Sequence, residues 1–150
     1  MNLLIVIRIK KNCLVHGDLC SINILLSKND KIHLIDFEDS HIGHPAFDLG
    51  YLLSEFFVAR INFPEQTTNI NDIVREFLDD YFKIFNKESR DFIEKEITPH
   101  TASMMIYRVF GLSKDSFTSY IKDEKIKDDV KKYAISMIKN HNQPINYFLN

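Results

Sequence analysis

Three short apolar runs, each bounded by polar residues, dominate the first part of this chain. They cover residues 13–15, 24–26 and 32–35. Short apolar runs of this kind are typical of buried β-strands. The segment from Ser27 to Lys31 separates the second run from the third and contains Asn and Asp, which favour tight turns. The pattern therefore predicts a strand at residues 13–15 and a buried β-hairpin over residues 24–35.

From residue 45 onward the apolar positions recur every three or four residues, the spacing of amphipathic helices. After a turn over residues 40–45, one helix is predicted to begin near Pro45 and to end before Pro64. The clearest helical stripe follows it, with Asn69 as the expected N-cap. Its apolar positions are Ile70, Val74, Phe77, Leu78, Tyr81, Phe82 and Phe85.

The remaining pattern predicts further helices. A charged amphipathic segment covers residues 90–97, and Thr98 followed by Pro99 indicates the start of a separate helix that Gly111 ends. The last helix is predicted over residues 123–140, and the tail from residue 143 is expected to be irregular. A small β-element followed by a helical bundle is an α+β fold, which we expect to form one domain over residues 1–150.

Composition and charge narrow the classes of protein to consider. The 150 residues carry a formal net charge of −2, which gives no reason to expect nucleic acid or an anionic membrane as a partner. Residues 3–9 are largely β-branched and are compatible with a strand, a truncated helix or a leader. That apolar run is too short for a signal core or a membrane span, so a cytoplasmic protein is expected. Cys13 and Cys20 are expected to be reduced core thiols.

Polar residues stand at the edges of the apolar runs. Asp18 follows the first run, Asn23 directly precedes the second, and Asp36 ends the third. The predicted hairpin would hold Asn23 and Asp36 near one end, beside the Asp18 loop. Two carboxylates and an amide suit Mg²⁺, which prefers oxygen ligands. Taken singly, each residue has a simpler explanation: a turn Asp, a capping Asn, or, for His16, a satisfied core histidine.

The combination of motifs is more specific than its members. His16-Gly17-Asp18, then Asn23 and a strand, then Ile35-Asp36-Phe37-Glu38-Asp39 resemble the catalytic loop and the metal-binding strand end of the aminoglycoside phosphotransferase/choline kinase family, relatives of the protein kinases. The stretch from Gly43 to Gly50 is similar to that family's following helix start. The resemblance at motif level covers residues 13–53 and implies a protein-kinase-like C-terminal lobe, with the two loops in residues 13–39 and a helical subdomain in residues 45–140.

The resemblance also implies roles for single residues. Asp18 would accept or orient the proton of a substrate hydroxyl, while Asn23 and Asp36 would hold Mg²⁺ against the phosphates of ATP. His16 and Asp48 are expected to support the catalytic loop. Glu38 and Asp39 would bind a second metal or a cationic substrate, or else lie solvated on the surface. Cys20, Ser21 and His44 depart from residues frequent in the family, but none of them replaces a required ligand.

The larger departure concerns the N-terminal lobe of such kinases. Only fifteen residues precede His16, and the four glycines do not form a phosphate-covering loop. Lys10 and Lys11 lie too near the motif to replace the strand lysine of that lobe. We therefore expect a truncated chain, weakly active or inactive alone.

Three interpretations stay open. The first is a kinase for the hydroxyl group of a small molecule of unknown identity, complete or completed by a separate chain that supplies the N-terminal lobe. The second is a non-catalytic module that binds nucleotide or metal, or has a regulatory role. The third is a remnant of a kinase gene, whose uncovered apolar surface would favour aggregation.

Overall fold

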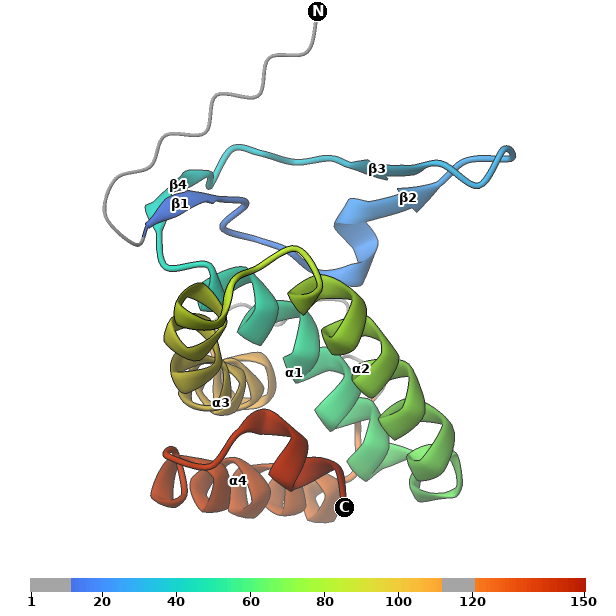
Figure 1. Cartoon of the computed structure of the whole chain (residues 1–150). Coiled ribbons are helices and arrows are strands. Elements are labelled where there is room, and N and C mark those ends of the chain that lie inside the picture. The colour runs from blue at the N-terminus through green and yellow to red at the C-terminus, as the bar shows by residue number, and fades with distance from the viewer. Residues whose placement is uncertain (1–11, 112–120) are drawn as a thin grey trace, which may run out of the picture.

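The computed structural model describes residues 12–111 and 121–150, in which small β-elements lie above a group of helices (Figure 1). The strands are β1 (Cys13–Val15), β2 (Ile24–Leu26), β3 (Ile32–Leu34) and β4 (His41–Gly43). The helices are α1 (Ala46–Asn62), α2 (Thr67–Phe82), α3 (Lys87–Phe110) and α4 (Glu124–Lys139). Short 3₁₀ turns are η1 (Ser21–Asn23), η2 (Pro64–Gln66) and η4 (Ile145–Leu149). This order agrees with the predicted α+β class.

The strands form two separate antiparallel pairs. The predicted hairpin is present, with β2 paired to β3 so that Ile24 lies opposite Leu34. The second pair joins β1 to β4, with Leu14 opposite Ile42. The region over residues 40–45 was predicted to be only a turn, and this part of the prediction is wrong. Residues His41–Gly43 are too few to show a strand-like alternation, and they form a strand by pairing with β1.

The expected burial of the hairpin is also wrong. Leu26 and Ile32 are 70% and 69% exposed, and Leu25 and Leu34 are exposed as well. In Figure 1 the hairpin projects beyond the helices, so the described part of the chain leaves much of it open to solvent. A short apolar run indicates a strand, but its periodicity carries no information about whether anything packs on it. Of the three residues of β1, only Val15 is buried.

Helix α1 is the centre of the helical layer. Its buried residues include Leu49, Leu53 and Phe57, and they pack in one core with residues of the other helices. The contact with α3 is close at Gly50, because a Cβ atom there would lie 2.5 Å from the Cβ of His100. A side chain larger than hydrogen would therefore force the two helices apart. From α2, α3 and α4 the core takes Val74, Leu78, Ile93, Ile97, Ala102, Met105, Val130, Ala134 and Met137.

Two predicted helix boundaries differ from the structure. Helix α2 begins at Thr67, because the 3₁₀ turn η2 leads directly into it, and Asn69 lies inside the helix instead of capping it. Helix α3 is continuous through Pro99 and starts after Asn86, whose side chain accepts a hydrogen bond from the Ser89 backbone N–H. Proline inside a helix costs about 3 kcal/mol. The buried side chains on both sides of Pro99 offset that cost.

The last helix matches its predicted range. Asp123 caps α4 by accepting a hydrogen bond from the Lys125 backbone N–H, and Asn140 follows its last turn. The tail was predicted to be irregular, but it forms η4 and packs into the core through Ile145, Phe148 and Leu149. The polar residues around Pro144 hid this contact from sequence analysis.

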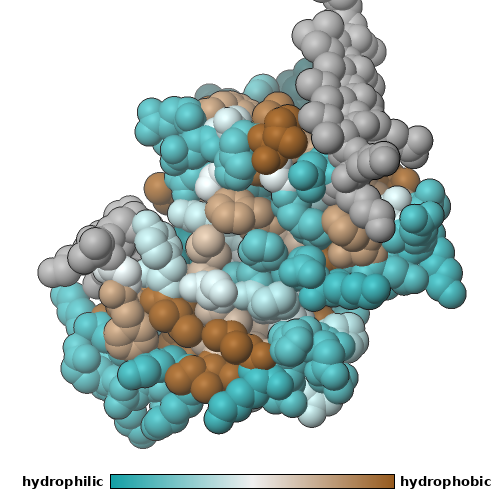
Figure 2. All heavy atoms as spheres, turned by 90° about the vertical axis from the view of Figure 1, so that its left-hand side faces the viewer, coloured by the Kyte–Doolittle hydropathy of each residue, from teal (hydrophilic) through white to brown (hydrophobic). Residues whose placement is uncertain are grey.

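Figure 2 shows one side of the molecule, which is largely hydrophilic, with an apolar band at the height of α3 and α4 and smaller apolar patches above it. Exposed apolar residues of these helices are Phe110, Ile135 and Ile138. Among the described residues, no helix has both the length and the apolar character needed to cross a bilayer. Residues 3–9, which are compatible with a strand, a truncated helix or a leader, lie outside the described residues.

The packing of the tail generates a first prediction. Replacing the buried Phe148 with alanine is expected to lower the free energy of unfolding by about 3–5 kcal/mol, because it removes a large core side chain. Replacing its neighbour Tyr147, which is 55% exposed, is expected to cost less than about 1 kcal/mol. Urea unfolding followed by circular dichroism measures both. Equal effects of the two substitutions would contradict a packed tail.

Candidate functional site

The loop that follows β1 depends on Gly17. Its φ angle is +89°, in the region that favours glycine. A Cβ atom at this position would also lie 2.2 Å from the carbonyl oxygen of Asp39. The segment after β3 therefore passes directly against the loop after β1, and only glycine leaves room for both.

His16 joins these two segments. Its ring is buried, with Nε2 2.8 Å from the Ile35 carbonyl oxygen and Nδ1 3.3 Å from the Asp18 backbone nitrogen. The neutral ring protonated at Nε2 satisfies both contacts, since Nε2 then donates to Ile35 and Nδ1 accepts from Asp18. The ring also packs 4.6 Å from that of Phe37. These contacts place His16 as a brace between the loop and the end of the hairpin.

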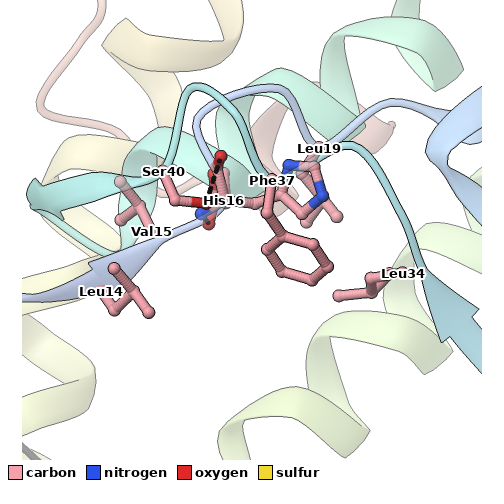
Figure 3. A pocket seen from close by; sticks show the side chains of 8 residues that line it. Leu14, Val15, His16, Leu19, Leu34, Phe37 and Ser40 are labelled. Carbon is pink, nitrogen blue, oxygen red and sulfur yellow. Dashed lines mark hydrogen bonds between the residues drawn. The ribbon is translucent and has the colours of Figure 1, made fainter.

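Asp48, in the first turn of α1, holds the same loop from below. Its carboxylate accepts hydrogen bonds from the backbone N–H groups of His16 and Gly17, at 2.7 and 3.1 Å. A further contact comes from the Ser40 hydroxyl, which donates to the His16 carbonyl oxygen at 3.1 Å (Figure 3). Hydrogen bonds to a charged group contribute about 1.5–3 kcal/mol, so α1 fixes the position of the loop.

The structure brings Asp18 and Asn23 together. The Asn23 side-chain amide donates to the Asp18 carboxylate oxygen Oδ2 and to the Asp18 carbonyl oxygen, both at 2.9 Å. Asn23 is buried at the end of η1, whereas Asp18 is half-buried. Because the amide nitrogen makes both contacts, Asn23 Oδ1 and Asp18 Oδ1 are the oxygens that remain for a ligand.

Asp36 lies just after β3, at the same end of the hairpin as Asn23. It is exposed, and the backbone of its neighbour Ile35 donates to the Asn23 carbonyl oxygen at 3.1 Å. Its φ angle is +66°, a left-handed conformation that aspartate tolerates better than most residues and that costs on the order of 1 kcal/mol. The structure thus places the backbone at residue 36 beside Asn23. The hydrogen bonds of the Asp18–Asn23 pair do not include the Asp36 side chain.

The donor set suits a metal ion that is held partly by phosphates. Across residues 12–111 and 121–150, no three His, Cys, Asp or Glu side chains cluster closely enough to hold a metal ion by themselves. Mg²⁺ often needs only one or two protein carboxylates, with waters and substrate phosphates as its other ligands. Asp36 and the amide oxygen of Asn23 fit that requirement.

A cavity of about 170 Å³ lies beside the loop. Apart from His16, Ser40 and Asp48, its lining is apolar: Leu14, Val15, Leu19, Leu34 and Phe37. Figure 3 shows the side chains of Leu14, Phe37 and Leu34 pointing to the same side of strands β1 and β3. The site therefore combines a polar edge at His16 and Asp48 with an apolar wall.

Sequence analysis missed a second support beneath the loop. The Glu55 carboxylate of α1 accepts from the Ser21 backbone N–H, at 3.1 Å to Oε2 and 3.3 Å to Oε1. Arg108 of α3 forms an ion pair with Glu55 at 3.0 Å, and both side chains are buried. Burial raises the pKa of the Glu55 carboxyl, and the Arg108 guanidinium opposes that increase. A charged residue between apolar positions, as in Leu53-Ser54-Glu55-Phe56-Phe57, is a signal that was available.

The two thiols lie at the edge of the site. Cys13 and Cys20 are free cysteines, and Cys20 is buried. Burial, together with the nearby carboxylates of Asp18 and Glu55, raises the pKa of the Cys20 thiol. The thiolate, which is the nucleophilic form, is therefore disfavoured, as in a structural cysteine.

Comparison with known families agrees with these motifs. A model of the phosphotransferase enzyme family matches residues 8–88, more than half of the 150 residues. The chain belongs to this family, which confirms the resemblance to aminoglycoside phosphotransferases. No curated protein and no solved structure gives a significant match. The matched region includes every site residue named above except Arg108.

The hydrogen bonds of Asp48 generate a second prediction. Asp48→Asn keeps the shape of the side chain but turns one acceptor into a donor that faces a backbone N–H. We expect the free energy of unfolding to fall by about 1.5–3 kcal/mol, as measured by urea denaturation. Asp72→Asn, at an exposed position of α2, is the control and is expected to change it by less than about 0.5 kcal/mol. An Asp48 variant as stable as that control would remove Asp48 as the support of the loop.

The histidines near the start of α1 generate a third prediction. Burial lowers the pKa of His44 and of His100, whose rings lie 6.3 Å apart, although Glu96 opposes both shifts. Below pH 6.5 the unfolded chain takes up protons first, so the folded state loses stability as the pH falls through the range from about 7 to 5.

The measurement is the free energy of unfolding at several pH values. His44→Gln combined with His100→Gln is expected to flatten the pH dependence between about pH 7 and 5. His33→Gln, at an exposed position of β3, is the matched control. If the free energy of unfolding of the double variant depends on pH as steeply as that of the unchanged chain, the two imidazole rings do not cause the loss of stability at low pH.

Proposed function

We propose that the chain is the catalytic-loop part of an ATP-dependent kinase that transfers the γ-phosphate to a hydroxyl group of a small molecule. Membership of the phosphotransferase family supports the general reaction. The observation that carries the proposal is the contact at 2.9 Å between the Asn23 amide and the Asp18 carboxylate. It holds a carboxylate at a loop braced by His16 and Asp48, where a substrate hydroxyl can reach its second oxygen.

The proposed roles follow from the physics of phosphoryl transfer. The transition state is loose and highly charged, so catalysis depends mainly on positioning and on charge neutralisation. Asp18 orients the attacking hydroxyl and accepts its proton through Oδ1, while Asn23 holds the other carboxylate oxygen in place. His16 and Asp48 keep the loop rigid and do not touch the substrate. Mg²⁺, when bound by Asn23 Oδ1 and Asp36, would neutralise charge on the ATP phosphates.

The arrangement of the chain supports a two-part kinase-like lobe. In this proposal residues 13–39 carry the catalytic and metal-binding loops, and residues 45–140 form the helical subdomain of the same domain. The β-layer that carries the loops also exposes apolar side chains, including those of Leu14, Leu26 and Ile32. We propose that a separate polypeptide, equivalent to the other lobe of such kinases, covers this layer and completes the nucleotide site.

A non-catalytic module is the second candidate. The observation that favours it is the exposure of Asp36 and of Leu34 and Phe37 beside it, which leaves the proposed metal site open to solvent in the described structure. Such a module would bind nucleotide or metal without turnover. Turnover in the presence of a small-molecule hydroxyl acceptor separates the two candidates.

The fourth prediction tests the nucleotide site. In calorimetric titration of the purified chain with Mg²⁺ and a non-hydrolysable ATP analogue, we expect binding that Asp36→Ala weakens at least about tenfold, or ~1.4 kcal/mol. Asp91→Ala, at an exposed position of α3, should bind like the unchanged chain. If the folded, monomeric chain shows no binding at all, it does not act as a kinase alone.

A further inference from the structure

We infer that the buried Glu55–Arg108 pair positions the catalytic loop, so that an element outside the loop motif sets the contact between Asp18 and Asn23. The inference rests on the proposed function for the meaning of those two residues. Three separate parts of the chain take part: η1 at the end of the loop, the middle of α1, and the last turn of α3.

The geometry of the short turn η1 depends on Glu55. This turn begins at Ser21 and ends at Asn23, and the preceding Cys20 provides no side-chain cap for it. The Glu55 carboxylate takes the place of a cap, since both of its oxygens lie within 3.3 Å of the Ser21 backbone nitrogen. Fixing the first residue of so short a turn also fixes its last residue, Asn23.

The Glu55 carboxylate is itself held in place by Arg108. Arg108 Nη2 lies 3.0 Å from Glu55 Oε1, and the exposed fractions of the two side chains are 1% and 5%. Arg108 is held in turn, because its Nε donates to the Ser54 hydroxyl at 2.8 Å and its guanidinium lies 4.5 Å from the centre of the Tyr51 ring. The carboxylate therefore cannot turn away from Ser21 without leaving the Arg108 charge buried and poorly compensated.

A contribution to stability alone does not explain why a buried Glu55–Arg108 ion pair is present. Apolar residues of similar volume often replace a buried ion pair without loss of stability, because two charges no longer have to be desolvated. An apolar pair cannot, however, accept a hydrogen bond from the Ser21 N–H group. Only the charged pair supplies an anion at a fixed position beneath the loop.

The test uses a variant that keeps the core filled. Glu55→Leu combined with Arg108→Met removes both charges together, so that no buried charge remains alone. We expect this variant to fold, while hydrogen exchange at the Ser21 backbone amide and at the Asn23 side-chain amide, followed by NMR, becomes at least tenfold faster. Glu55→Gln with Arg108→Met keeps a neutral acceptor near Ser21, and a smaller acceleration is expected.

Arg60→Met is the matched control. Arg60 is an arginine of the helical layer that is only partly buried, and it donates to Asn71, to Tyr133 and to the Phe148 carbonyl oxygen at the far end of α1. Its loss is expected to lower the melting temperature without changing exchange at Ser21 or Asn23. Unchanged exchange in the folded Glu55/Arg108 variant, or the same acceleration in the Arg60 control, would overturn the inference.

Nucleotide binding provides the second readout. With Mg²⁺ and a non-hydrolysable ATP analogue, the Glu55→Leu/Arg108→Met variant is expected to bind at least tenfold more weakly than the unchanged chain. Faster exchange with undiminished affinity would reduce the pair to a structural support and overturn its positioning role. If the unchanged chain does not bind, it does not act as a kinase alone, whereas the exchange rates still decide whether the pair holds Asn23 at Asp18.

Discussion

The two hydrogen bonds from the loop backbone to Asp48 are the constraint on which the rest of the site depends. A loop that turns sharply at Gly17 points the N–H groups of residues 16 and 17 inward, where water cannot satisfy them. An unsatisfied buried N–H costs about 1–3 kcal/mol, so the loop needs an acceptor at that place. The Asp48 carboxylate, at 2.7 and 3.1 Å from the two nitrogens, supplies it from the first turn of a rigid helix. His16 can then reach Ile35, and the hairpin is tied to the loop.

Further residues along helix α1 hold other segments of the chain in the same way. Asp48 and Glu55 are seven residues apart, which places them on one face of the helix about 10.5 Å from each other. The first holds the start of the loop at His16 and Gly17, and the second holds its end at Ser21. Arg60, farther along the same helix, bonds to the carbonyl oxygen of Phe148 in the C-terminal tail. One helix therefore connects the candidate site with the most distant part of the core.

The sequence predicted the parts of this arrangement that depend on local chemistry. The hairpin, the bounds of α4 and the meeting of Asn23 with the Asp18 loop follow from turn residues, caps and short spacing. The burial of the hairpin was not predictable in this way, because a run such as residues 24–26 looks the same whether or not another layer covers it. Strand β4 and the continuous α3 depend on tertiary partners, the first on the backbone of β1 and the second on the core packed around Pro99. Glu55 and Arg108 were missed because a charged residue on a helix indicates a solvated surface until its partner on another helix is known.

The exposed β-layer and the exposure of Asp36 are two aspects of one physical problem. Charge that develops during phosphoryl transfer is best stabilised where water is excluded and the effective dielectric constant is low. Asp36 is exposed, and the apolar residues Leu34 and Phe37 beside it are 42% and 54% exposed, so the described residues do not provide that environment. A polypeptide that packed on these side chains would remove apolar surface from water and at the same time dry the space above Asp36 and Asn23. In the proposed kinase, one binding event would therefore both bury this layer and complete the active site.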